Sequence, residues 1–109
     1  MSYTLASGMQ VKVGVRYVDA AGNPAQIDGD VVWASSDESV VIVFVNSTDS
    51  TKAVLRTAGP VGQVQVTAVA DADLGDGVRH LVTPMDVTVV AGEAVSGVIE
   101  PSGPAEPIP

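Results

Sequence analysis

The chain has 109 residues, a formal net charge of −8 and no cysteine. This length suits one domain with a single modest core, and an apolar content of 46% argues against disorder. With 13 acidic residues against 5 basic ones, the chain offers little to nucleic-acid phosphates or anionic membranes, so neither is expected as a partner. The lack of cysteine excludes disulfides and thiolate metal sites. Valine dominates the apolar residues and favours strands over helices.

The first predicted strand covers residues 9–18, where apolar and polar side chains alternate strictly. Its inward face is expected to hold Met9, Val11, Val13, Val15 and Tyr17. A hydrophobic period of two residues indicates one buried and one solvent-exposed face, as in an antiparallel sheet that is packed on one side. The segment 19–24 contains glycine, asparagine and proline and therefore predicts a turn.

Residues 31–34 and 40–45 predict two further strands, separated by the polar segment 35–39. The 40–45 strand is apolar on both faces: one face holds Val41, Val43 and Val45, and the other holds Val40, Ile42 and Phe44. If the first set points inward, the second forms an exposed apolar stripe of the kind that marks interfaces. If another part of the chain covers the strand, the stripe belongs to the core, and the sequence leaves both possibilities open.

Three more strands are predicted from alternation over residues 52–58, 63–68 and 81–90. Their inward side chains are expected to be Ala53, Leu55, Val64, Val66, Ala68, Met85, Val87 and Val89. Residues 95–99 are predicted as a last short edge strand. The segment 100–109 is rich in proline, which cannot join the interior of a ladder, and is expected to be an extended tail.

About seven short strands with regularly spaced turn signals are typical of an all-β fold, a two-sheet Greek-key sandwich. We expect this sandwich to occupy residues 1–99 and the tail to occupy residues 100–109.

The run 31–43 resembles the signature of the bacterial immunoglobulin-like domain, group 2. It has an apolar residue before Trp33, then Ser35-Ser36-Asp37, then an apolar strand. Two downstream runs, Leu-Arg-Thr-Ala-Gly at 55–59 and Gly-Gln-Val-Gln-Val-Thr-Ala at 62–68, also match the family pattern. The resemblance implies an immunoglobulin-like sandwich in which Trp33 fills the centre and the polar corner carries the chain between the sheets.

The chain also resembles short single-domain immunoglobulin-like proteins encoded among the structural genes of tailed bacteriophages. The features are the segments 19–24, 70–75 and 90–95, the last standing before a proline-rich tail. This resemblance implies a non-enzymatic virion structural or accessory protein on phage capsid or tail proteins, present as a homo-oligomer or symmetric array. Such a protein is made in the host cytoplasm, in keeping with an N-terminus that lacks the pattern of a signal peptide.

An alternative function follows from the adhesin members of the group 2 family. They imply a carbohydrate- or receptor-binding adhesion module that contacts a glycan on a host surface. An exposed aromatic platform would favour this alternative, and the chain has only four aromatic residues, counting Trp33.

Asp71, Asp73 and Asp76 lie in an acidic, glycine-containing loop at 71–77 and are candidates for binding a calcium ion. The EF-hand pattern is not met, because the twelfth position is Val82 rather than a carboxylate. A solvated acidic loop is the favoured interpretation, and no cofactor is expected.

No residue pattern points to catalysis. His80 is the single histidine, with no cysteine partner and no evident serine nucleophile. Asp37 and Glu38 are adjacent, so on a strand their side chains would point apart. We therefore expect a protein that is not an enzyme. Asn46-Ser-Thr48 matches a glycosylation acceptor, which means little without secretion.

Overall fold

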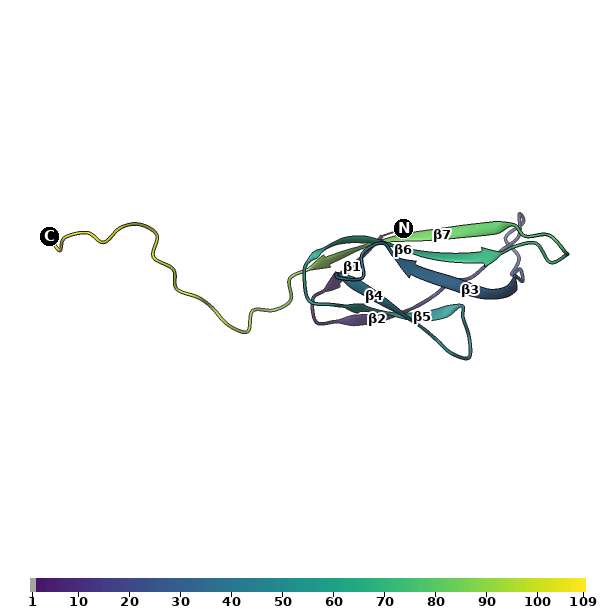
Figure 1. Cartoon of the computed structure of the whole chain (residues 1–109), viewed down its shortest axis with the longest axis horizontal. Coiled ribbons are helices and arrows are strands. Elements are labelled where there is room, and N and C mark those ends of the chain that lie inside the picture. Colours follow the sequence, from purple (N-terminus) through teal and green to yellow (C-terminus); the bar gives the residue numbers. More distant parts are fainter. Residues whose placement is uncertain (1) are drawn as a thin grey trace.

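The structure is a computed structural model and describes residues 2–109. Over these residues it contains no helix and seven strands (Figure 1). The strands are β1 (Ser2–Ala6), β2 (Gln10–Gly14), β3 (Asp28–Ser35), β4 (Val41–Val45), β5 (Lys52–Thr57), β6 (Gly62–Asp71) and β7 (His80–Val90). With no helix present, the described residues include none that is long and apolar enough to cross a membrane.

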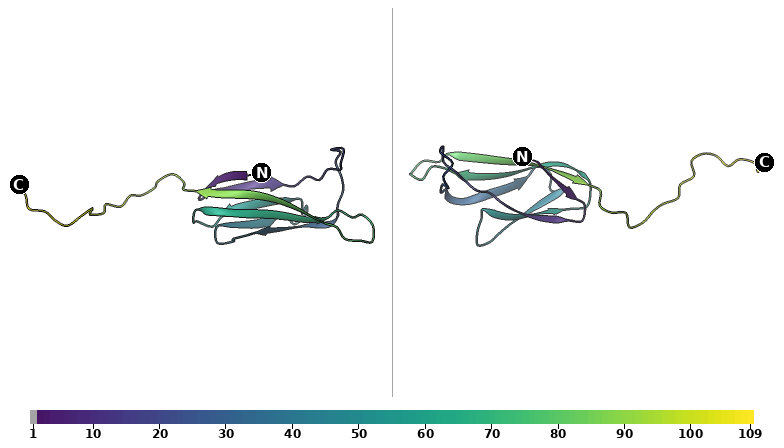
Figure 2. Two further views of the ribbon diagram at one scale, coloured as in Figure 1. Left: turned by 90° about the horizontal axis from the view of Figure 1, so that it is seen from above. Right: turned by 180° about the vertical axis from the view of Figure 1, so that it is seen from behind.

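Two sheets stack face to face (Figure 2). One has four strands in the order β1-β7-β6-β3, and the other has three in the order β2-β5-β4. β1 pairs with β7 in parallel, whereas the remaining strand pairs are antiparallel. The all-β, two-sheet sandwich of about seven strands that the sequence predicts is confirmed.

The period of two in the sequence decides which side chains are buried. In β6, Val64, Val66 and Ala68 face the other sheet and are at most 3% exposed, whereas Gln65 is exposed. The same holds for the other inward residues predicted in this half of the chain: Ala53, Leu55, Val87 and Val89 are buried, and Met85 is partly buried. The alternation of apolar and polar residues predicts burial correctly here because each sheet is covered on one face only.

The strand β1 was not predicted. It pairs with β7 along its whole length, with Leu5 opposite Val89, and Leu5 is its one buried residue. A five-residue segment with a single inward side chain carries too little periodicity to be recognised. After β1 the chain crosses to the other sheet through a tight turn, in which Gly8 adopts a φ of 85°.

The strand predicted over 9–18 is shorter than expected, because only Gln10–Gly14 pairs within the sheet. Val11 and Val13 pack against the core as predicted, but Met9 is 58% exposed because it still belongs to the turn. Tyr17 is buried as expected. Its hydroxyl finds no hydrogen-bond partner among the described residues, and burial raises its pKa.

The predicted turn at 19–24 is present. The Asp19 carboxylate accepts hydrogen bonds from the backbone N–H groups of Ala21 and Asn23, each at 2.9 Å. Gly22 has a φ of 86°, a conformation that other residues rarely adopt. The hydrogen bonds from Asn23 lower the pKa of Asp19, because they favour the charged carboxylate.

The polar corner at 35–39 carries the chain from β3 in one sheet to β4 in the other. Asp37 accepts hydrogen bonds from the hydroxyl and the N–H of Ser39, which lower its pKa. Ser36 exchanges two bonds with Gln65 of β6, one through its N–H and one through its hydroxyl oxygen, both 2.9 Å long. The corner therefore has the role that the sequence predicts.

The interior consists of two clusters of buried side chains, and Trp33 packs against both. The first holds Leu5, Val40, Val41, Leu55, Val64, Val66, Val87 and Val89, and the second holds Tyr17, Val31, Ala68 and Ala70. The indole is half-buried rather than enclosed, and its Nε1 donates to the carbonyl oxygen of Ser50 over 2.7 Å. Trp33 thus joins the two clusters and also fixes the loop before β5.

Residues 91–109 form no strand and extend away from the sandwich, as Figure 1 shows in the yellow-green segment. The edge strand predicted over 95–99 is therefore wrong, and the extended part begins after Val90 instead of at residue 100. At its C-terminal end β7 already has β1 on one side and β6 on the other, so no place beside that end is left for the returning chain. Val95 and Ile99 are 97% and 100% exposed.

We predict that Trp33→Ala lowers the free energy of unfolding by about 3 kcal/mol, because it removes the contact between the clusters and the bond to Ser50. Urea unfolding followed by circular dichroism measures this. Val32→Thr is the matched control on the same strand, since Val32 is 65% exposed, and it should change stability by less than about 0.5 kcal/mol. An unchanged stability of Trp33→Ala would contradict this account of the core.

Candidate interaction surface

The predicted stripe of Val40, Ile42 and Phe44 exists only in part. Val40 is 8% exposed and belongs to the first core cluster, so of the two possibilities left open by the sequence the core holds for Val40, which is not an interface residue. Its N–H still bonds to the carbonyl of Asp37, because residue 40 belongs to the corner and not yet to β4. The alternation of the strand therefore does not reach back to it. Val40 instead packs against the backbone of Gly62, where an added Cβ would lie 3.3 Å from its methyl carbon.

Ile42 and Phe44 do lie on the outer face of the three-stranded sheet. Ile42 is partly buried and Phe44 is 46% exposed. The register places Ile42 beside Arg56 and Phe44 beside Val54 on β5. The guanidinium of Arg56 lies over the Phe44 ring, 4.8 Å from its centroid, which is the geometry of a cation–π contact.

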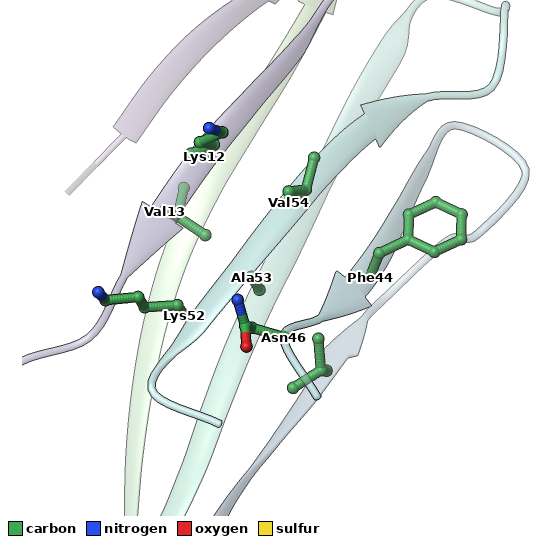
Figure 3. A pocket seen from close by; sticks show the side chains of 8 residues that line it. Lys12, Val13, Phe44, Asn46, Lys52, Ala53 and Val54 are labelled. Carbon is green, nitrogen blue, oxygen red and sulfur yellow. The ribbon is translucent and has the colours of Figure 1, made fainter. Parts of the chain in front are cut away.

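Lys12, Val54 and Phe44 come from three adjacent strands and form one row across the sheet (Figure 3). The next row joins Gln10, Arg56 and Ile42. Arg56 Nε also donates to the Gln10 side-chain oxygen over 3.2 Å, which holds the guanidinium in place above the ring. We call the outward side chains of these two rows and of Lys52 the outer face.

The outer face is cationic although the chain as a whole is acidic. It carries Lys12, Lys52 and Arg56, three of the five basic residues, and β2, β4 and β5 contain no acidic residue. An open hollow of about 460 Å³ lies on this face, lined in part by Lys12, Phe44 and Lys52. Apolar, aromatic and cationic groups meet here, a composition typical of protein contact surfaces.

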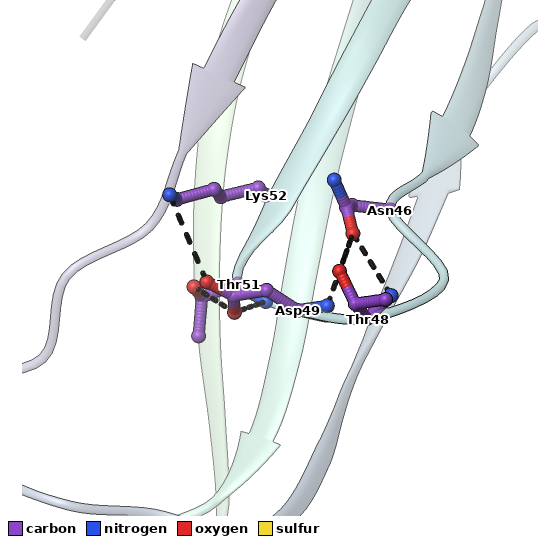
Figure 4. A network of polar contacts seen from close by, with 5 residues as sticks. All are labelled: Asn46, Thr48, Asp49, Thr51 and Lys52. Carbon is purple, nitrogen blue, oxygen red and sulfur yellow. Dashed lines mark hydrogen bonds and ion pairs between the residues drawn. The ribbon is translucent and has the colours of Figure 1, made fainter.

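The turn between β4 and β5 holds one end of the outer face in shape (Figure 4). The Asn46 side-chain oxygen accepts from the N–H and the hydroxyl of Thr48, so the amide of the glycosylation pattern caps its own turn. The Asp49 carboxylate accepts from the hydroxyl and the N–H of Thr51, which lower its pKa. Lys52 Nζ lies 3.9 Å from the same carboxylate, an exposed pair worth little to stability.

The acidic loop uses its carboxylates to shape its own backbone. Asp71 accepts from the N–H groups of Arg79 and Asp73, each at 2.9 Å, and Asp73 accepts from the N–H of Gly75 at 2.8 Å. Within residues 2–109, Asp71, Asp73 and Asp76 do not come together as a group that could hold a metal ion. The structure therefore gives Asp71 and Asp73 a role in the turn.

The remaining candidates do not meet in one place. His80 begins β7 opposite Asp71, and it is exposed beside Arg79 at the far end of the four-stranded sheet. Asp37 and Glu38 are exposed in the corner, where Asp37 is already bonded to Ser39.

Two features of the surface were missed from the sequence. One is the part that Lys12 and Arg56 play in the outer face, because they are close only through the register of β2 with β5. The alternation of Lys52, Val54 and Arg56 was the available signal. The other is an apolar row on the four-stranded sheet, where Val32, Val69 and Val82 lie side by side on β3, β6 and β7.

No family model, curated protein or solved structure that was compared with the chain matches it.

We predict that acid weakens the protein partly through Asp71. The hydrogen bonds from Arg79 and Asp73 lower its pKa below the ordinary value of 3.8, so the carboxylate stabilises the fold fully above that pH. This stabilisation is lost as the pH falls through the lowered value. Asp71→Asn should therefore melt below the native protein at pH 7, and the difference should close on acidification.

Thermal unfolding between pH 7 and pH 2.5 measures this difference. Asp76→Asn is the matched control in the same loop, because the Asp76 side chain makes no hydrogen bond within residues 2–109, and it should keep the native melting temperature at pH 7. A gap between Asp71→Asn and the native protein that stays constant down to pH 2.5 would contradict the assignment.

Proposed function

We propose that this chain is a non-enzymatic virion structural or accessory protein. In this proposal it is an immunoglobulin-like Greek-key domain of the group 2 bacterial type, bound to the capsid or tail of a tailed bacteriophage. It acts through protein–protein contacts, and it is made and assembled in the host cytoplasm.

The order of the strands supports the immunoglobulin-like part of this proposal. In an immunoglobulin constant domain, strands A, B, E and D form one sheet and C, F and G form the other. If β1 to β7 are taken as A to G, the sheets of this chain read B-E-D and A-G-F-C. The two arrangements agree except for the first strand, which here pairs with the last strand of the other sheet.

The proposal of a contact function rests on one observation, the Arg56 guanidinium held over the exposed ring of Phe44. Arginine and aromatic side chains are enriched where proteins bind one another. Both groups are fixed in advance, Arg56 by Gln10 and Phe44 by its strand, so little conformational entropy is lost when a partner binds. A partner surface with carboxylates and apolar groups would complement this face.

We predict that mass spectrometry of purified phage particles detects this chain as a stoichiometric component. The particles are those of the phage whose genome encodes the chain. A preparation that holds the known capsid and tail proteins but lacks this chain would contradict the proposal.

We further predict that Arg56→Glu lowers the occupancy of the chain on particles at least about tenfold, because it reverses a charge at the centre of the outer face. Quantitative mass spectrometry of particles reconstituted with each variant measures this. Arg16→Glu is the matched control, since Arg16 is exposed outside the sheet and changes the net charge equally. Equal occupancy of the two variants would show that the outer face is not the contact.

A second candidate function is a carbohydrate- or receptor-binding adhesion module, favoured by the same Phe44 ring. The ring borders the hollow that Asn46 and Lys12 also line, and such a combination of an aromatic ring with polar groups suits a sugar. Binding on a glycan array that is lost in Phe44→Ala would support this alternative. An array without signals would leave the virion protein as the proposal.

A further inference from the structure

We propose that the tail segment 93–100 of one copy pairs as an added strand with the free edge of β4 in a second copy. This head-to-tail association does not depend on the proposed virion function. Four features support it: the unprotected β4 edge, the composition of the tail, the direction in which the tail leaves the sandwich, and charge.

β4 is an edge strand without the usual protection against pairing. Its sequence, Val-Ile-Val-Phe-Val, contains no charge and no proline, and its register with β5 is unbroken. Edge strands are normally guarded by charges, prolines, polar residues or bulges. The other edges have such devices: β2 carries Lys12, β3 has a register shift between Asp28 and Val32, β7 has Pro84 beyond the reach of β1, and β1 is mostly polar.

The backbone of β4 presents free hydrogen-bonding groups at this edge. On the β5 side, Val40 and Asn46 make ladder bonds, with Ala58 and Lys52 respectively. Because bonded and outward positions alternate in an antiparallel pair, the N–H and C=O groups of Val43 and Val45 point away from β5. An incoming extended segment can bond to these groups.

The tail contains one segment suited to this edge. Residues 93–100 read Glu-Ala-Val-Ser-Gly-Val-Ile-Glu, and they precede the prolines at 101–109, which could not donate to a ladder. Val95, Val98 and Ile99 are between 83% and 100% exposed, so these side chains have no packing partner within residues 2–109. Valine and isoleucine fit a pleated, half-buried surface.

The tail is directed away from its own β4. It continues β7 outward, so the molecule measures 83 × 24 × 21 Å (Figures 1 and 2). Near its start, Gly92 packs so closely on the Ser7 carbonyl oxygen that a Cβ there would lie 2.9 Å from it. The tail therefore starts in close contact with the β1–β2 turn and then extends away from the sandwich (Figure 1).

Complementary charge also favours the tail segment as the strand that is added to β4. The segment 93–100 has two glutamates and no basic residue, whereas Lys52 and Arg56 lie one strand in from the β4 edge. A strand added there would run about 10 Å from β5, two interstrand spacings, which long basic side chains can bridge. Since the tail of one copy and the edge of another are different surfaces, the contact is heterologous and generates rings or chains.

Sedimentation velocity of the full chain over a concentration series tests the proposal with two blocking variants. Val95→Asp/Ile99→Asp disables the tail, and Ile108→Asp is its control within the proline-rich part. Val45→Pro disables the edge by removing an outward N–H, and Val45→Thr is its control. Should circular dichroism show that Val45→Pro does not fold, Val45→Asp replaces it by setting a carboxylate against the acidic tail.

We expect the native chain and both controls to self-associate, with each blocking variant weakening the association at least about tenfold. An equimolar mixture of the two blocking variants should form dimers and nothing larger, because one supplies only a tail and the other only an edge. A monomeric native chain at its solubility limit would overturn the proposal, as would a mixture that stays monomeric. Docking of the tail on its own β4 would appear as a monomeric native chain and would therefore overturn it too.

Discussion

The fold depends on the burial of one face of each sheet against the other, with Trp33 at the junction of the two core clusters. The side chains of the larger cluster are mostly valines, and Trp33 packs against this cluster as well as the second one. The indole N–H also donates to the backbone carbonyl of Ser50, just before β5. A small interior of this kind has little stability to spare, so one large side chain matters more here than in a bigger domain.

Each sheet buries one face and exposes the other, so the two exposed faces can differ in composition. The four-stranded sheet turns threonine, glutamine and valine outward, whereas the three-stranded sheet turns out a phenylalanine and three cations. In a chain with a net charge of −8, such a concentration of basic groups creates a local field opposite to that of the rest of the surface. This contrast is why the proposed contacts, with a particle and with the acidic tail, both involve the smaller sheet.

Aspartate side chains stabilise the turns that connect the strands. Asp19, Asp37, Asp49 and Asp71 each accept hydrogen bonds within a turn or corner, and these bonds lower the pKa of each carboxyl. The main donor is a side-chain hydroxyl for Asp37 and Asp49 and a backbone N–H for Asp19 and Asp71. Four of the thirteen acidic residues therefore shape loops through their hydrogen bonds. The loop 71–77 has the composition of a cation site, but Asp71 and Asp73 accept hydrogen bonds from the backbone of the loop instead.

The sequence by itself determined the all-β class, most of the strands and the inward residues of β5, β6 and β7, because a period of two is a local property that burial on one face imposes. Only the tertiary structure decided the pairing of β1 with β7, the burial of Val40 and the meeting of Lys12, Arg56 and Phe44. Each of these depends on which strands become neighbours and in which register. Strand pairing and register depend on contacts between residues far apart in the chain, so they cannot be predicted from any short stretch of sequence.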